Sequence, residues 1–547
     1  MAPLTKKCID DEFPTGEVDD NIDDVWFDWK MILISAGSVS EIIISGQVSG
    51  TLAHFNFSSF PNLTFLDMSG INLSDIIPVD IGNATQLQRL WLFANNLNGN
   101  IPSSIGLLTE LQTLLLDHNN LNSSIPPELG LCTKLNILDL GGNSLTGPLP
   151  LSFSNLTQIS DLSLWDNCLS GELLPHFLSN WTELTSLDMK NNTFTGNIPS
   201  EIGSIPESVF THLANLEFLN LTGNLFKGPL LPGNFSKVLK LKELRLEWNR
   251  LSGFIPDSIG QLTELQDLVL KENNLNSSIP PELGLCTKLN ILDLYANSLT
   301  GPLPLSFSNL TQISQLSLNN NHLSGELSHI FSNWTELTTL SIQDNTFTGN
   351  IPSEIGEFPT ALCKLKTLLV LDMSSNSLSG AFPQCLGDRS TLTVINLTSI
   401  NIEAYLQQLG NLNVLESLDF SSNRLIGKVP WQLSTLEFLS TLNLSTNNLS
   451  GEIPQGRHFD TFGEGSFLGN LDLCGAPMTK KCRDDEFSTQ GVDNDVDDGW
   501  FDWKMILIGY GSGLVCGLST GYIVFTTSKP WRFVMIIERA QQKLIRR

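Results

Sequence analysis

One sequence frame recurs along most of this 547-residue chain. The segments LQRLWLFANNLNGNIP (Leu87–Pro102), LQTLLLDHNNLNSSIP (Leu111–Pro126) and LNILDLGGNSLTGPLP (Leu135–Pro150) begin 24 residues apart. The frame LxxLxLxxNxL occurs about 17 times between Ile42 and Pro454, and its ninth position is asparagine in 14 of these turns. Such a period is typical of architectures in which each repeat stacks on the next. The repeat therefore predicts a solenoid.

The residues of the frame predict the structure of each turn. Each LxL is expected to form a short strand whose leucines point inward, because side chains alternate between the faces of a strand. Stacking pairs these strands in parallel, and each buried asparagine, with one acceptor and two donors, hydrogen-bonds the turning backbone. The following GxIP element favours extended backbone before proline and predicts a second strand on the convex side. Ile71 and Ile400 replace the asparagine, so we expect two irregular turns.

The repeats and the C-terminal segments together resemble a known family. The form LxGxIPxxLGxLxx resembles the plant-specific leucine-rich repeat, which is also similar to the repeats of plant receptor kinases. The sequences NLDLCGAPMTKKC and FDWKMILIGYGSGLVCGLSTGYIVF resemble the C-terminus of plant leucine-rich-repeat receptor-like proteins. The resemblance implies an α/β-type solenoid, a leucine-rich-repeat superhelix of about 17 repeats with parallel β-strands on the concave face, followed by a C-terminal transmembrane helix.

The same resemblance implies a function. Members of the family are kinase-less, single-pass receptors that recognise extracellular ligands and signal through partner receptor kinases. We therefore expect an extracellular peptide, or another microbial or plant-derived molecule, as the ligand, and a role such as plant defense. Two alternatives stay open: an inhibitor-like binding protein for a microbial wall-degrading enzyme, and a non-functional rearranged product that faces the cytosol.

Shifts in composition divide the chain into segments. We expect an irregular duplicated segment at 1–38, the solenoid at 39–455, a C-terminal cap at 456–483, an acidic juxtamembrane linker at 484–504, a transmembrane helix at 505–527 and a short basic tail at 528–547. The 23 uncharged residues from Met505 to Thr527 are enough to cross a bilayer core of about 30 Å. Because acidic residues precede this span and basic residues follow it, the repeats are expected outside the plasma membrane.

The predicted membrane helix carries a repeated glycine spacing. Glycines that recur every four residues line one helix face and allow another helix to approach closely, which predicts pairing with the helix of a partner kinase. They are Gly509, Gly513, Gly517 and Gly521.

One duplication links the two ends of the chain. Ala2–Ile34 and Ala476–Ile508 are identical at 24 of 33 positions, so the N-terminal segment copies the juxtamembrane region. This copy stands where the family has a signal peptide and a cysteine-paired cap, neither of which is visible. Either a genomic rearrangement or a misjoined gene model accounts for it. Without the cap, we expect an exposed first strand edge.

A second duplication lies within the repeats. Glu110–Glu172 and Glu264–Glu326 differ at ten of 63 positions, and all ten differences fall in the 18 variable slots of their three frames. Those slots form the concave face or its margin. One explanation is that exposed positions drift while frame positions cannot change without opening cavities. The unchanged convex stretch PPELGLCTKLN favours the other explanation, in which the concave strands were altered for recognition.

Candidate contact residues follow from the frame. They are large aromatic or charged residues in solvent-side slots, where a monomeric protein has little reason to expose aromatic rings. Aromatic residues and arginine are the usual anchors of interfaces. The predicted ligand-binding residues are Trp91, Phe93, His118, Trp165, Lys190, Arg245, Glu247, Trp248, Lys271 and Tyr295.

Composition excludes other classes of function. The net charge of -27 argues against a nucleic-acid partner. The chain has no Gly-rich phosphate loop, no GxSxG and no kinase motif set, so we expect no enzyme, no cofactor and no metal site.

Cysteines and glycosylation motifs complete the predictions. The resemblance implies a cap disulfide between Cys474 and Cys482, and Cys363 and Cys385, nearly one repeat apart, predict a second one. Sixteen N-x-S/T motifs favour an exported, glycosylated surface. The expected glycosylation sites are Asn56, Asn62, Asn83, Asn122, Asn155, Asn180, Asn234, Asn276, Asn309 and Asn333. Four further motifs are expected on the concave side, at Asn191, Asn220, Asn396 and Asn443.

Overall fold

The computed structural model divides the chain into two units, Met1–Cys482 and Arg483–Arg547, and every described residue belongs to the first. The predicted linker, membrane helix, glycine face and tail therefore lie outside the described residues. Within the described part, no helix is both long enough and apolar enough to cross a membrane. The structure describes residues 31–35, 38–46, 49–199, 213–230, 235, 238–327, 331–350, 362, 365–380, 382, 386, 391–402, 406–456 and 459–482.

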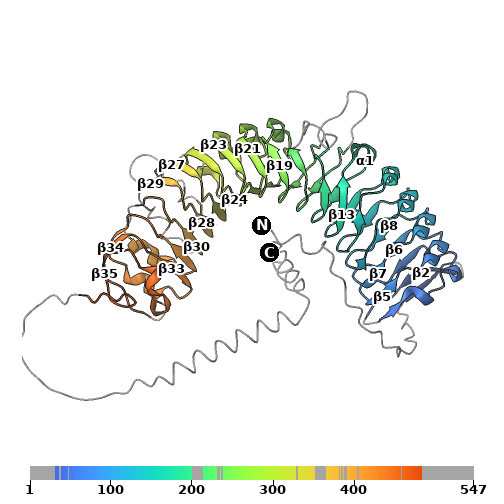
Figure 1. Ribbon diagram of the computed structural model, residues 1–547, viewed down its shortest axis with the longest axis horizontal. Coiled ribbons are helices and arrows are strands. Elements are labelled where there is room, and N and C mark those ends of the chain that lie inside the picture. The colour runs from blue at the N-terminus through green and yellow to red at the C-terminus, as the bar shows by residue number, and fades with distance from the viewer. Residues whose placement is uncertain are drawn as a thin grey trace, which may run out of the picture. The chain divides into compact units, whose positions relative to one another are not determined.

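The first unit is a solenoid whose inner side is one continuous sheet (Figure 1). Of the 18 strands that this sheet has among the described residues, 17 are parallel and contribute one strand per turn, which confirms the predicted number of repeats. The inner strands are β1 (Met31–Ser35), β2 (Ser38–Ile43), β4 (Phe65–Asp67), β6 (Arg89–Trp91), β8 (Thr113–Leu115), β10 (Ile137–Asp139), β12 (Asp161–Ser163), β14 (Ser186–Asp188), β16 (Phe218–Asn220), β18 (Glu243–Arg245), β20 (Asp267–Val269), β22 (Ile291–Asp293), β24 (Gln315–Ser317), β26 (Thr339–Ser341), β28 (Val370–Asp372), β30 (Val394–Asn396), β31 (Ser417–Asp419) and β33 (Thr441–Asn443).

A second set of strands follows the ladder asparagines, as the GxIP element predicts. These strands form short parallel sheets rather than one continuous sheet. They are β3 (Gly50–Thr51), β5 (Leu73–Ile76), β7 (Asn96–Gly99) and β9 (Asn120–Leu121); β11 (Thr146–Gly147), β13 (Cys168–Glu172) and β15 (Thr193–Thr195); β17 (Lys227–Pro229), β19 (Arg250–Gly253), β21 (Asn274–Ser278), β23 (Ser298–Pro302), β25 (His322–Glu326), β27 (Thr346–Asn350) and β29 (Ser377–Ser379); and β32 (Ile426–Gly427), β34 (Asn448–Glu452) and β35 (Asp472–Cys474).

Short helices return the chain to the next inner strand. In eight of the described turns the helix begins directly after a proline that follows Ile, Leu or Val, and the ring of this proline fixes the φ angle of the residue before the helix. The helices are α1 (Pro175–Asn180) and the 3-10 helices η2 (Leu52–His54), η3 (Phe57–Ser59), η4 (Val79–Asn83), η5 (Ser103–Leu107), η6 (Pro127–Leu131), η7 (Leu151–Asn155), η9 (Asp257–Gln261), η10 (Pro281–Leu285), η11 (Leu305–Asn309), η12 (Phe331–Asn333), η14 (Leu406–Asn411), η15 (Trp431–Thr435), η16 (Phe459–Thr461) and η17 (Glu464–Ser466).

The predicted asparagine ladder is present. Asn143 Oδ1 accepts a hydrogen bond from the backbone N–H of Leu121 in the preceding turn at 3.0 Å. Its Nδ2 donates to the carbonyl of Leu116 at 3.0 Å and to that of Leu140 at 3.1 Å. Because these backbone groups are buried and need partners, each asparagine ties its own turn to the one before. Asn470, which lies outside the predicted frames, extends the ladder into the cap.

The two turns in which isoleucine replaces the ladder asparagine are irregular, as predicted. In both, the residue after the isoleucine has a positive φ, namely 57° at Asn72 and 57° at Asn401. The N–H of Ile71 and the N–H of Ile400 still find acceptors, because the asparagine of the following turn binds each of them. The stacking therefore continues through both sites.

The prediction of an exposed first strand edge is wrong. Strand β1 comes from the duplicated segment and pairs antiparallel with β2, with Met31 opposite Ile43 and Ser35 opposite Ser38. This strand covers the edge that the first repeat would otherwise leave unpaired. An unpaired strand edge offers hydrogen bonds to any adjacent extended chain, which explains why β1 pairs here. Part of the segment 1–38 is therefore a regular strand.

The other end of the solenoid is closed by a cap. Cys474 and Cys482 form the predicted disulfide, with their Cα atoms 4.9 Å apart. Phe467 and Leu473 are buried against the last turn, so the cap covers the end of the apolar core. Cys363 and Cys385 lie outside the described residues.

Candidate functional site

The inner face offers the same slots on every turn. The middle residue between the two leucines of each inner strand points outward, and two more outward residues precede the ladder asparagine. The second of these has a left-handed backbone, with φ of 53° at His118 and 54° at Trp248. Positive φ is rare for bulky residues. The turn geometry imposes it here, because the same slot has positive φ in turn after turn.

Five of the predicted residues form an N-terminal patch, which spans the turns of β6 to β14: Trp91, Phe93, His118, Trp165 and Lys190. At one end of it, the Trp91 ring packs edge-on against Phe65, with ring centroids 4.9 Å apart. The guanidinium of Arg89 lies 4.0 Å above the same Phe65 ring and pairs with Glu41 at 3.2 Å. Trp91 Nε1 is buried and has no hydrogen-bond partner among the described residues.

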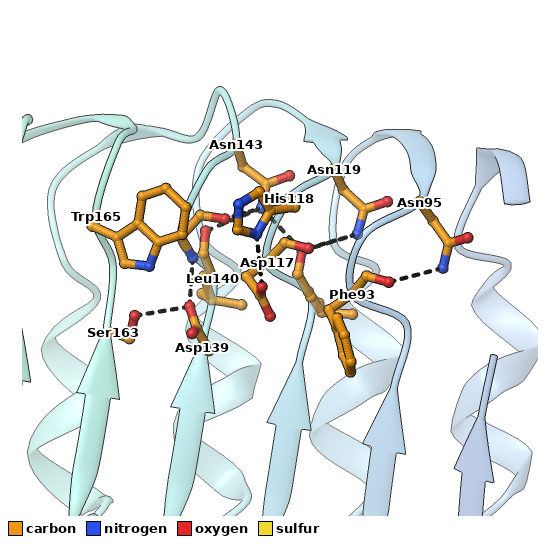
Figure 2. A network of polar contacts seen from close by, with 12 residues as sticks. Phe93, Asn95, Asp117, His118, Asn119, Asp139, Leu140, Asn143, Ser163 and Trp165 are labelled. Atoms are coloured by element: carbon orange, nitrogen blue, oxygen red, sulfur yellow. Dashed lines mark hydrogen bonds and ion pairs between the residues drawn. The ribbon is translucent and has the colours of Figure 1, made fainter. Parts of the chain in front are cut away.

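Trp165 lies across two neighbouring turns (Figure 2). A Cβ added to Gly141, in the preceding turn, would lie 2.2 Å from Trp165 Nε1. Two turns back, the His118 ring packs edge-on against the indole with centroids 4.9 Å apart. On the other side, Lys190 Nζ lies 5.3 Å from the ring centroid, within the range of a cation–π contact. The indole is therefore half-buried in the surface of the sheet.

Carboxylates surround this indole. His118 Nδ1 lies 2.9 Å from Asp117 Oδ2, and this hydrogen bond raises the pKa of the imidazole above its usual value, against the opposing effect of burial. Burial, assisted by the nearby charge of Asp117, raises the pKa of Asp139 to about 6. Asp139 Oδ1 accepts from the N–H of Gly141 and from the Ser163 hydroxyl, both at 2.9 Å. The patch can therefore change its charge in mildly acidic conditions.

The other five predicted residues form a middle patch, which spans the turns of β18 to β22: Arg245, Glu247, Trp248, Lys271 and Tyr295. The guanidinium of Arg245 pairs with Asp267 at 2.6 Å and with Glu243 at 3.3 Å. Lys271 Nζ pairs with Asp293 at 3.2 Å and lies 5.8 Å from the centroid of the Trp248 ring. This patch is thus a row of ion pairs beside the ring of Trp248.

The prediction that Glu247 is exposed is wrong, since only 9% of the residue is accessible. Burial raises the pKa of its carboxyl, while Thr222, Lys271 and Arg245 act in the opposite direction. Sequence analysis placed Glu247 in a solvent-side slot correctly. The frame does not predict how deeply that slot is buried.

The structure brings all ten predicted residues onto the inner face, as two patches of five. Trp91, Phe93, Trp165 and Tyr295 are half-buried, and Trp248, at 41% accessible, is the exposed aromatic residue of the set. Sequence analysis missed Phe65, Arg89 and Asp139. Phe65 lies in the strand beside that of Trp91, Arg89 lies in the strand of Trp91 itself, and Asp139 occupies the outward slot of β10 between two buried leucines, so their frame positions were the available signal.

The inner-face glycosylation motifs lie where they were predicted, but their amides are engaged. Nδ2 of Asn191 donates to Asp166 at 2.6 Å, that of Asn396 to Asp372 at 3.1 Å and that of Asn443 to Asp419 at 3.1 Å. Asn220 is buried. These side chains therefore contribute to the sheet surface.

Comparison with protein families gives the same architecture. The leucine-rich repeat family model matches nine segments, at 62–84, 110–132, 134–156, 183–205, 240–262, 288–310, 336–358, 414–436 and 438–456. The chain thus contains leucine-rich repeats. Its regular turns extend beyond the matched segments, because the same strand and ladder contacts continue between them.

This leucine-rich-repeat protein is similar to plant receptor-like proteins. It is 41% identical over 81 residues to Receptor-like protein 9DC3 of Solanum pimpinellifolium, which is 14% of this chain and 9% of that protein. It is 38% identical over 78 residues to Receptor-like protein 53 of Arabidopsis thaliana, covering 14% of this chain and 8% of that protein. The matched segment thus spans about a tenth of the length of these relatives.

Solved plant ectodomains share the fold over most of the chain. The leucine-rich-repeat ectodomain of the Arabidopsis thaliana receptor kinase GASSHO1/SCHENGEN3, in complex with CASPARIAN STRIP INTEGRITY FACTOR 2, superposes with a TM-score of 0.57 at 30% identity, covering 81% of this chain and 60% of that one. The Arabidopsis receptor kinase HAESA, in complex with the peptide hormone IDA and the co-receptor SERK1, gives 0.57 at 27% identity, covering 83% and 94%.

Proposed function

We propose that this protein is a cell-surface receptor-like protein that binds an extracellular ligand, a peptide in particular, on the inner face of the turns from β6 to β22. The observation that carries the proposal is the gathering of aromatic and charged side chains into two patches on that face. The duplicated segments support it, because all ten of their differences lie in the frame slots that form this face or its margin.

The relatives support the same ligand-binding role. The HAESA structure holds a peptide hormone and a co-receptor, and the curated relatives are receptor-like proteins. On this view the ligand joins the present chain to a partner receptor kinase, as the peptide hormone and the co-receptor are both bound in the HAESA structure. The apolar stretch 505–527, with its glycine face, would anchor the chain in the plasma membrane and pair with the partner's helix.

Peptide selection with matched surface variants tests the ligand-binding role. Peptides are selected from a random display library on the purified full-length protein, and their affinities are then measured against variants. One variant gives the first duplicated block the residues of the second, by Gly141→Tyr, Gly142→Ala and Trp165→Asn together. The control is Trp431→Ala, which removes a tryptophan that is 65% exposed on η15, away from the inner sheet.

We expect the inner-face variant to weaken the binding of peptides that use the N-terminal patch by at least about tenfold, since buried aromatic anchors dominate interfaces. The control should bind as the original protein does. Equal binding by both variants would refute the assignment of the inner face.

A second experiment tests export. Asn155 is exposed at the end of η7, where an oligosaccharide has room. Endoglycosidase treatment of the chain expressed in plant cells should increase its electrophoretic mobility. An unchanged mobility would contradict a cell-surface location.

A further inference from the structure

Three exposed leucines occupy equivalent positions on the return helices, the short helices that lead back to the inner strands. Leu107 ends η5, Leu131 ends η6 and Leu285 ends η10. These leucines are 57%, 53% and 54% exposed, respectively. Large apolar side chains that gather on a protein surface usually mark a face that another molecule covers, or one that is prone to aggregation. The recurring leucine therefore requires an explanation.

The return helix of an adjacent turn carries a glycosylation motif at the same position. Asn83 ends η4, one turn before Leu107, and Asn155 ends η7, one turn after Leu131. Both intervals are 24 residues, which is one repeat. Both asparagines are exposed and begin N-x-S/T motifs. Each of these two leucines thus has an exposed motif asparagine in the equivalent position of the next helix.

The packing of the return helices brings these positions close together. Helix η4 lies beside η5, and η6 lies beside η7. A Cβ added to Gly82, next to Asn83, would lie 3.0 Å from Leu107 Cδ1, so this leucine leans toward the turn of Asn83. A Cβ added to Gly130 in η6 would overlap the carbonyl oxygen of Ser152 in η7. The glycines therefore allow neighbouring helices to pack at close range, and a group attached to one helix end can reach the next.

The helices that end in a motif asparagine also begin with an exposed apolar residue. Val79 begins η4, Leu151 begins η7 and Leu305 begins η11, and all three side chains are more exposed than the leucines at the helix ends. Each motif asparagine therefore has one exposed apolar residue in its own helix and another in the adjacent turn.

The second duplicated block has the same arrangement. Leu285 ends η10 and Asn309 ends η11, so they correspond to Leu131 and Asn155 of the first block. The sequences of these return helices are identical in the two blocks, whereas the frame slots of the inner face or its margin differ at ten positions. Leucine and motif have therefore stayed together while the inner face changed, as expected if the two act together.

We infer that N-linked oligosaccharides on Asn83, Asn155 and Asn309 lie over the exposed leucines of the adjacent turns and cover this apolar surface. The inference rests on the exported location in the proposed function, because such motifs are modified on the surfaces of secreted proteins. Sugar rings have apolar C–H faces and hydrated hydroxyl groups, so they can contact leucine on one side and water on the other. Bulky sugars here would also keep protein partners off these helices.

Hydroxyl-radical footprinting of the full-length protein, expressed in plant cells, tests this arrangement. Mass spectrometry measures the oxidation of each leucine side chain and reports which motifs carry a sugar. The variants are Asn83→Gln, Asn155→Gln and Asn309→Gln, each of which removes one motif. Asn122→Gln is the matched control, because Asn122 is an exposed motif asparagine that follows β9 and does not end a return helix. Equal urea unfolding midpoints verify that the variants remain folded.

We expect each of the three variants to raise the oxidation of the leucine one turn away at least about twofold, because that exposed side chain loses its cover. The other two leucines should oxidise as in the original protein. So should Trp431, which is exposed at the start of η15, a helix without a motif. The control Asn122→Gln should change none of these rates.

Leucines that oxidise readily in the original protein and no faster in the variants would show that the surface is open, which overturns the inference. Leucines that stay protected after the sugar is lost would assign the surface to a protein partner or a second copy, which also overturns it. Sugar-free Asn83, Asn155 and Asn309 in a chain glycosylated elsewhere would overturn the inference and leave the proposed function intact. A chain without sugar at any motif would overturn both.

Discussion

The indole of Trp165 occupies the space that a side chain on Gly141 would need. An added Cβ on Gly141 would lie 2.2 Å from Trp165 Nε1. In the second duplicated block, tyrosine replaces this glycine at Tyr295, and asparagine replaces the tryptophan at Asn319. The two differences are therefore coupled, because a large residue in one of these slots leaves no room for a large residue in the other.

This relationship predicts coupled mutations. Gly141→Ala alone should displace the indole and destabilise the protein by about 1–3 kcal/mol, the usual cost of overpacking. With Trp165→Asn already present, the same alanine should cost little, giving a coupling free energy of about 1 kcal/mol or more. Urea unfolding of the four proteins in the cycle measures it. Additive effects would show that the two residues do not compete for space.

The asparagine ladder predicts a large loss of stability. Asn143→Ala leaves the N–H of Leu121 and the carbonyls of Leu116 and Leu140 without their side-chain partner in a buried site. Each unsatisfied buried group costs about 1–3 kcal/mol, so the urea midpoint should fall markedly. The exposed Ser144, one residue later, provides the control Ser144→Ala, which should unfold almost as the original does. Similar midpoints for both variants would contradict a stabilising ladder.

The pKa of Asp139 predicts how stability depends on pH. Since folding raises this pKa from 3.8 to about 6, the folded state holds the proton more tightly than the unfolded state. The contribution of Asp139 to stability is therefore fully present below about pH 4 and is lost as pH rises through 6.

Asp139→Asn removes this titration but retains an oxygen that can accept from Gly141 and Ser163. The variant should gain stability relative to the original protein between pH 4.5 and pH 8, as measured by urea midpoints at both values. A difference between the two proteins that stays constant with pH would show that Asp139 does not titrate in this range.

The position of the cap disulfide predicts that its removal speeds hydrogen exchange only in the turns next to the cap. Cys482→Ser opens the short loop closed by Cys474, and the chain-entropy estimate for so small a loop is about 2–3 kcal/mol. Because each turn contacts mainly its neighbours, hydrogen exchange should accelerate in β34 and β35 while the turns near β10 keep their protection. A uniform loss of protection along the solenoid would contradict this nearest-neighbour behaviour.

The sequence was sufficient for the architecture, because the fold is local. The leucines of each strand can be buried only if successive turns stack in register. Each ladder asparagine hydrogen-bonds backbone groups of the preceding turn, a nearly constant number of residues earlier in the chain. For the same reason, comparison of the two duplicated blocks marked Gly141 and Trp165 as positions on the inner face before their contact was known.

The repeat frame does not predict which side chains of neighbouring turns contact one another. Glu247 and Trp248 occupy neighbouring slots, yet one is buried and the other exposed, because burial depends on which side chains the adjacent turns supply. Met31–Ile34 repeats the first four residues of the predicted membrane segment, but forms a strand because β2 offers an unpaired edge. Periodicity thus specifies the coil and its surfaces, whereas the chemistry of the inner face arises from side chains that meet only when the turns stack.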